Sequence, residues 1–229
     1  DIVGQVASWC ARRVDQILNT TDLTDAAGRE LRIAFGELAE MSGWLHFDAG
    51  RFEQARFDYG EALQAARLTD DLNLEVLVLA SMNTLARYRG RPREAIQLAQ
   101  LAQRRAAGWG PPRLLALLTA REAVGWAQLG DTSSSQAAMR RARHTFAPEI
   151  RSEDPPWIAF FDDAELAARR ATAAAYLGQQ DQAIDQMRQA VGSLGPSYQR
   201  NRAYYSVRLG LSQLDRGDEV GACQTVAAV

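Results

Sequence analysis

Apolar residues recur at helical spacing along most of the chain, so the pattern predicts helices. The segment from Ile2 to Leu18 places its apolar residues on one stripe, which is typical of an amphipathic helix. Thr24 is a candidate N-cap for a second helix, whose apolar pattern then continues to Ala49. The pattern predicts further helices over 51–71, 72–89, 93–107, 113–129, 133–146, 180–194, 197–216 and 219–229.

A glycine recurs where the first helix of each predicted pair ends. These turn positions are Gly50, Gly90, Gly130, Gly178 and Gly217. Glycine readily takes the left-handed backbone conformation that is common at the C-terminus of a helix. Small residues recur in phase with the turns, mostly alanine or glycine: Ala55, Ala95, Ser135, Ala183 and Ala222; Ala62, Ala102, Ala142, Ala190 and the larger Val229; and Gly43, Asn83, Ala123, Ala171 and Gly210. Because close helix packing needs short side chains, we interpret the chain as five repeated helical hairpins.

The interval before Gly178 is longer than the others. It contains Pro155 and Pro156, which can open a helix but not lie inside one, and Asp154 can cap it. Trp157 and the two phenylalanines that follow have helical spacing and favour a core role. The sequence therefore predicts that the extra residues add two turns to the first helix of the fourth hairpin.

The first hairpin resembles the tetratricopeptide repeat. The matching residues are Gly43, Gly50, Phe52, Ala55, Tyr59 and Ala62. Later units match less well, and the spacing exceeds the usual period of about 34 residues. The resemblance implies an all-α fold, an α-solenoid of about five hairpins in a right-handed superhelix, with an extra N-terminal helix. We expect one domain over 1–229, with repeats over 36–71, 72–108, 111–147, 155–195 and 197–229.

The composition limits the classes of partner and the cellular location that we expect. A net charge of −2 argues against this chain gripping a nucleic-acid backbone by itself, and all 26 basic residues are arginine. Arginines surround the turn at Gly90, which a solvated hairpin tip explains better than a nucleic-acid patch. Cys10 and Cys223 lack metal-ligand spacing, so we expect reduced thiols. With no membrane-length apolar run and no signal peptide visible, the expected location is the cytoplasm.

No catalytic constellation is recognisable, so the chain is not expected to be an enzyme or to hold a metal or cofactor. His46 and His144 are far apart in sequence, without an acid or nucleophile at a known spacing. His46 lies inside the best repeat, which favours a core or groove-wall role over catalysis.

In tetratricopeptide superhelices the leading helix of each hairpin lines a concave groove. The resemblance therefore implies a ligand-binding face made of Glu40, Trp44, Asp48, Ser81, Thr84, Arg87, Tyr88, Arg121, Gln128, Arg169, Thr172, Tyr176, Tyr204 and Arg208. Arg121, Arg169 and Arg208 share one slot, and such a ladder could hold carboxylates or carbonyls of an extended peptide. The alternative, equally weighted, is that each pairs with an acid of its own chain.

Several segments of the sequence resemble the C-terminal region of a group of bacterial transcriptional regulators. They are GWLHFDAGR, LASMNTLARYRGRPREA, PPRLLALLTAREA and DPPWIAFFDDAELA. That group carries an N-terminal helix-turn-helix of the Cro/repressor type before a tetratricopeptide-like domain. No helix-turn-helix is recognisable in this sequence, and the chain does not begin with methionine, so we expect the DNA-binding domain upstream of Asp1.

The resemblance implies a sensing domain. It would bind a peptide, a small signal or a partner protein in the groove, and would reach DNA only through the upstream domain. A constitutive scaffold without a small ligand is the alternative, and an enzyme has little support. No membrane partner is expected, and apolar residues at both ends leave a homodimer open.

Overall fold

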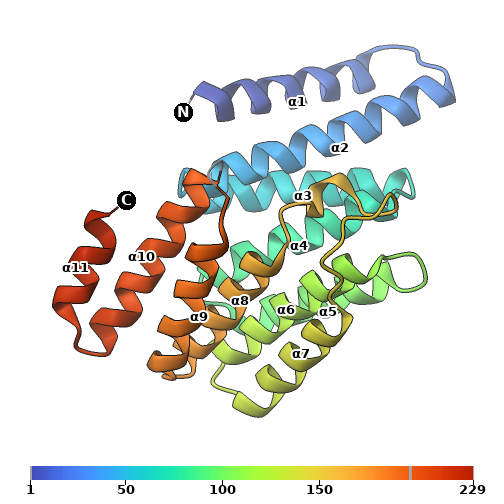
Figure 1. The fold of residues 1–229 in the computed structure, drawn as a ribbon. Coiled ribbons are helices and arrows are strands. Elements are labelled where there is room, and N and C mark those ends of the chain that lie inside the picture. The colour runs from blue at the N-terminus through green and yellow to red at the C-terminus, as the bar shows by residue number, and fades with distance from the viewer. Residues whose placement is uncertain (1, 196–197, 229) are drawn as a thin grey trace. The chain divides into compact units, whose positions relative to one another are not determined.

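The computed structural model describes residues 2–195 and 198–228. Over these residues the chain is all-α, with eleven α-helices, one 3-10 helix and no β-strand (Figure 1). The chain divides into two compact units, Asp1–Gly108 and Trp109–Val229. The predicted all-α fold of five repeated hairpins is confirmed. The assignment of 1–229 to one domain stays a prediction. The first and last residues of the predicted fifth repeat, Ser197 and Val229, lie outside the described residues.

The first unit is an N-terminal helix followed by two hairpins. Its helices are α1 (Ile2–Thr20), α2 (Asp25–Asp48), α3 (Phe52–Leu68), α4 (Leu72–Tyr88) and α5 (Pro92–Ala106). Helix α2 packs on both α1 and α3, so it forms the floor between them. Thr24 caps α2 by accepting a hydrogen bond from the backbone N–H of Ala27, as predicted.

The second unit contains three hairpins. Its helices are α6 (Pro112–Gln128), α7 (Thr132–Thr145), the 3-10 helix η1 (Pro156–Ile158), α8 (Asp163–Tyr176), α9 (Gln180–Ser193), α10 (Gln199–Asp215) and α11 (Glu219–Ala227). Asp131 caps α7 and Asp162 caps α8, each accepting from a backbone N–H three residues later.

The repeat positions behave as the sequence predicts. All five turn glycines have positive φ, from 68° at Gly90 to 87° at Gly217. The residue five positions beyond each turn glycine is buried in every hairpin. The hydrogen bonds between the two helices of a hairpin differ from repeat to repeat. Asn83, before the turn at Gly90, donates to the carbonyl of Ala95 at 2.7 Å, whereas Ser135, after the turn at Gly130, donates to the carbonyl of Ala123 at 2.9 Å. The two helices of a hairpin are therefore joined by different chemistry in different repeats.

The predicted extension of the fourth leading helix is wrong. Helix α8 begins only at Asp163, and the extra residues form an irregular segment with one short 3-10 turn. Asp154 does not cap a helix but pairs with the buried Arg113 at the start of α6, with Nε 3.1 Å from Oδ2. Phe161 is fully buried, which agrees with its expected core role, whereas Trp157 and Phe160, expected in the core as well, are only half-buried. The two prolines open the 3-10 turn, where their missing N–H groups cost nothing.

Candidate functional site

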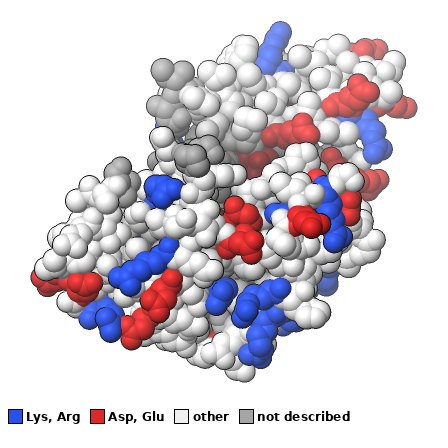
Figure 2. Space-filling view, viewed as in Figure 1, with Lys and Arg blue, Asp and Glu red and all other residues white. Residues whose placement is uncertain are grey.

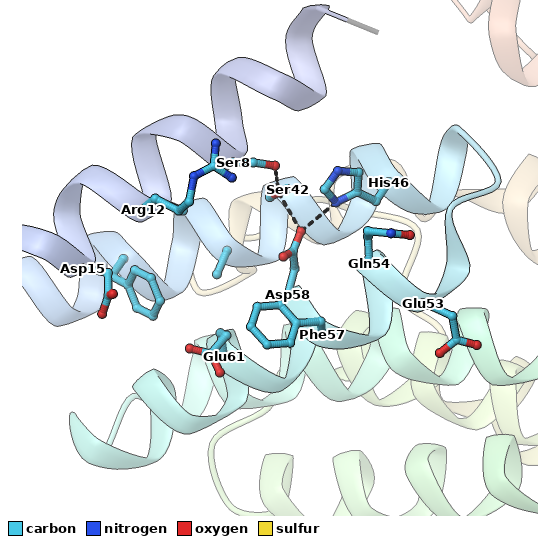
Figure 3. Close-up of a pocket in the computed structure, with 13 residues that line it drawn as sticks. Ser8, Arg12, Asp15, Ser42, His46, Glu53, Gln54, Phe57, Asp58 and Glu61 are labelled. Carbon is cyan, nitrogen blue, oxygen red and sulfur yellow. Dashed lines mark hydrogen bonds and ion pairs between the residues drawn. The ribbon is translucent and has the colours of Figure 1, made fainter.

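A cavity of about 560 Å³ opens in the first unit between α1 and α3, above α2 (Figure 3). Each helix presents one stripe of residues to it. The lining consists of Ser8, Ala11, Arg12 and Asp15 from α1; Phe35, Ala39, Ser42 and His46 from α2; and Glu53, Gln54, Phe57, Asp58 and Glu61 from α3. The volume is within the range of small-molecule sites, roughly 300–1,000 Å³.

A chain of polar contacts crosses the wall of this cavity. Asp58 Oδ2 accepts from Ser42 Oγ at 2.6 Å and lies 2.8 Å from His46 Nδ1. A carboxylate only accepts, so Nδ1 carries the proton in this contact. Ser8 Oγ on α1 lies 2.8 Å from Ser42 Oγ, where either hydroxyl can be the donor, and Ser8 Oγ also donates to the carbonyl of Gly4 at 2.9 Å. The contacts thus connect all three helices.

This arrangement is suited to binding rather than to nucleophilic catalysis. In a serine–histidine–aspartate triad the histidine lies between the other two groups and takes the serine proton. Here the carboxylate of Asp58 lies between Ser42 and His46, and both contact the same oxygen. His46 is buried, which agrees with the core role expected for it, and it also lines this cavity.

The predicted binding face of the first unit lies on α2 and α4. Glu40, Trp44 and Asp48 belong to α2, and Ser81, Thr84, Arg87 and Tyr88 belong to α4. The structure brings part of it together, because Ser81 donates to Glu40 across the two helices at 2.7 Å. Tyr88 packs edge-on against Phe47 of α2, with centroids 5.0 Å apart. Thr84, in contrast, donates to a carbonyl of its own helix.

The predicted binding face of the second unit lies on α6, α8 and α10. Arg121 and Gln128 belong to α6; Arg169, Thr172 and Tyr176 to α8; and Tyr204 and Arg208 to α10. Arg208 brings α10 and α8 together by stacking on the ring of Tyr176, with Cζ 5.9 Å from the centroid. Thr172 donates to a carbonyl of its own helix, so its hydroxyl does not reach a neighbour as a donor.

The arginines of the predicted ladder have different surroundings. Arg169 pairs with Glu165, which also accepts from the hydroxyl of Tyr205. Glu122 pairs with Arg141 of α7 at 3.0 Å. Arg121 is buried, whereas Arg208 is half-buried against Tyr176. The arginines that share this slot therefore differ in burial, and Arg169 and Arg208 also differ in the groups that they contact.

The arginines around Gly90 are explained by contacts within the chain. Arg89 pairs with Glu53 at 2.6 Å, and Arg91 lies 3.4 Å from Glu94. On the face shown in Figure 2, basic and acidic side chains are interspersed, and neither sign covers the surface. These contacts agree with the hairpin-tip interpretation.

A second buried polar network is found at the start of α6. The guanidinium of Arg113, only 1% exposed, binds Asp154 and donates to the carbonyls of Phe161 and Pro148. Its Cζ also lies 5.7 Å from the ring centroid of Phe146. This network holds the irregular segment before α8 and is closed to solvent.

Comparisons with known proteins give the fold. The crystal structure of BtubC (BKLC) from P. vanneervenii is similar, with a TM-score of 0.62 and 18% sequence identity, over 98% of this chain and 87% of that one. At this identity the likeness shows the fold alone. No family model matches the sequence, and no curated protein matches it.

Metal-binding clusters and membrane-spanning helices are both absent from the described part of the chain. Among residues 2–195 and 198–228, no three histidine, cysteine or acidic side chains are arranged to hold a metal ion. Within the same ranges, no helix combines the length and apolar character needed to cross a membrane.

The cavity between α1 and α3 was missed by sequence reasoning, apart from His46. Ser42 and His46 are four residues apart on α2 and share a face with Ala39 and Phe35. Two polar residues on an otherwise apolar helix face were the available signal. Nothing comparable identified Asp58 or Ser8, because their place depends on how α1 and α3 pack on α2.

Proposed function

We propose that this chain is the protein-interaction and sensing domain of a helix-turn-helix transcriptional regulator, with the DNA-binding domain upstream. Repeated helical hairpins present extended surfaces for partners, which supports an interaction role. The link to a regulator is supported by the sequence segments that resemble that group. In this proposal an extended peptide segment binds the leading helices.

The observation that carries the proposal is a pair of exposed tyrosines, each with an arginine at its ring. Tyr88 and Tyr176 stand two residues before a turn glycine and are 43% and 39% exposed. Arg87 has its Cζ 4.7 Å from the ring centroid of Tyr88, and Arg208 lies over Tyr176. Tyrosine and arginine dominate binding hot spots, and stacking restrains both side chains before a partner arrives.

The tyrosine–arginine pair of the second unit favours a segment with carboxylate or carbonyl groups beside an apolar side chain. Arg208 is half-buried and, because it is stacked through its face, it keeps N–H donors at its edge that match carboxylates, whereas Arg87 is buried beside Tyr88. On α10, Tyr204 is exposed beside Arg208 and adds aromatic area. An acidic peptide with an aromatic or aliphatic residue fits both features.

A constitutive scaffold remains the second candidate. Several charged groups of the predicted face have partners in their own chain, as Glu40 has with Ser81 and Arg169 with Glu165. A surface already satisfied in this way does not need a small ligand. A homodimer through exposed apolar residues at the two ends of the chain also stays a prediction.

The test uses peptides selected on the immobilised chain from a random library. The affinity of a selected peptide is measured by calorimetry for wild type, Tyr176→Ala and Tyr88→Ala, with Tyr198→Ala as the matched control. Tyr198 is equally exposed but is the N-cap residue of α10 and does not belong to the predicted binding residues. We expect about tenfold or greater loss for at least one of the first two variants, as for a hot-spot residue. Equal affinity in all four proteins would contradict the proposal.

The regulator part has its own measurement. With the upstream domain attached, DNA affinity is compared by fluorescence anisotropy in the presence and absence of the selected peptide. A change in DNA affinity supports a sensor, because a ligand shifts an equilibrium only through differential binding. Unchanged DNA affinity supports the scaffold.

A further inference from the structure

The cavity between α1 and α3 carries an excess of negative charge. Its lining includes the carboxylates of Asp15, Glu53, Asp58 and Glu61 but only one arginine, Arg12. Glu53 is partly compensated by Arg89, whose Nη2 lies 2.6 Å from Oε1. The remaining charge favours a cation and disfavours an anion.

Asp58 is held in place before any ligand binds. Its contacts from Ser42 and His46 both reach the same oxygen, Oδ2. Oδ1 therefore keeps its acceptor capacity, and the side chain is 17% exposed on the cavity wall. In Figure 3 the carboxylate lies between Ser42 and the ring of Phe57. A fixed carboxylate binds a cation without first losing rotamer entropy.

The rest of the lining is apolar enough to bind more than an inorganic ion. Phe57 lines the cavity from α3 and is 67% exposed, while Phe35, Ala11 and Ala39 supply further apolar surface. The face of an aromatic ring attracts cations, and burying exposed ring area contributes further binding free energy. An occupant with both a charge and an apolar body uses both features.

We infer that this cavity is a binding site for an organic cation, a primary ammonium or guanidinium group on an apolar body. The charged group contacts Asp58 Oδ1, and the apolar body lies against Phe57. Ser42 and His46 are positioning residues that hold Asp58. The inference does not depend on peptide binding by the leading helices, which lies on other residues.

The inference is tested on the full chain with three compounds of similar shape. Phenethylamine is the cationic probe, phenethyl alcohol the neutral one and hydrocinnamate the anionic one. Calorimetry at millimolar concentration should detect phenethylamine, with clearly weaker binding of the alcohol and none of the acid. No binding of phenethylamine, or equal binding of all three, overturns the inference.

Variants then locate the site. Asp58→Asn should weaken phenethylamine binding by about tenfold or more, as expected for a hydrogen bond to a charged group. Glu61→Gln should weaken it about two- to fivefold through lost charge alone. Glu37→Gln is the matched control, because Glu37 is exposed on α2 outside the cavity. If Asp58→Asn loses structure by circular dichroism, Glu61→Gln and Phe57→Leu decide the question: wild-type affinity in both overturns the inference.

Discussion

The two units each bury a polar network, but the two networks differ in what surrounds them. In the second unit Arg113 is enclosed, with its donors directed at Asp154 and at two backbone carbonyls. In the first unit Asp58 has two donors on one oxygen and faces an open cavity. A buried charged group can therefore have a structural role or a binding role in the same fold. Where the network is sealed it holds a segment, and where it lies beside open volume it can bind.

The two networks also differ in sequence range. Asp58 and His46 are 12 residues apart, on the two helices of a single hairpin, and Ser8 and Ser42, on α1 and α2, are 34 residues apart. Arg113 and Asp154 are 41 residues apart and connect a helix start to an irregular segment. The sealed network thus holds an irregular segment, whereas the open one joins helices that also pack directly on each other.

The largest effect is expected from breaking the sealed network. Arg113→Met leaves the two carbonyls without this donor and leaves Asp154 with only the backbone N–H of Arg151, and removing one partner of a buried ion pair costs about 3–5 kcal/mol. Urea unfolding followed by circular dichroism measures this free energy. Arg151→Gln in the same segment is the control, because its pair with Glu153 is exposed and should matter by less than about 1 kcal/mol. Equal stability of the two variants would show that the segment is not held by Arg113.

A smaller effect tests whether the cavity reflects loose packing of the first unit. A Cβ at Gly43 would lie 2.6 Å from ring carbons of the fully buried Tyr59, between α2 and α3. Gly43→Ala should therefore destabilise by about 1–3 kcal/mol, as overpacking does.

Gly60 offers the matched control for Gly43. It lies on α3, and a methyl group added there would meet no atom within 4 Å beyond the backbone of its own helix. Gly60→Ala should therefore stabilise by about 0.5–1 kcal/mol through helix propensity. Thermal unfolding of both variants shows whether each substitution lowers or raises the stability of the fold. A neutral Gly43→Ala would mean that the hairpin beneath the cavity is loose.

The smallest effect concerns a carboxylate outside both networks. Asp131 caps α7, and its hydrogen bonds from the backbone and side chain of Ser134 lower its pKa. A lowered folded-state pKa stabilises the fold above the unfolded value of about 3.9, and this contribution is lost as pH falls through the folded value. Unfolding of wild type and Asp131→Asn should therefore differ slightly at neutral pH and converge in acid. A constant difference across that range would contradict the assignment.

The sequence predicted the features that depend on neighbours within one hairpin. Turn glycines and small buried slots such as Ala55 follow from close packing of two adjacent helices, so their spacing is visible in the chain. The segment containing Pro155 was misjudged, because proline can open an α-helix or a 3-10 turn. Arg113, distant in sequence, decides between them.

The binding residues were harder to predict for the same reason. The leading-helix positions came from a family resemblance, which places residues on helices but does not choose their partners. Arg169 pairs with Glu165, whereas Arg208 stacks on Tyr176, although both occupy one repeat slot. The cavity depends on the packing of α1 and α3 on α2, and no periodicity encodes that packing.

The most direct measurement of the difference between the open and the sealed network is amide hydrogen exchange of the full chain with and without phenethylamine. We predict slower exchange in peptides from α1 and α3, which form the walls beside Asp58, and no change over residues 147–162 around Arg113. Protection over residues 147–162, or none in α1 and α3, would contradict the account.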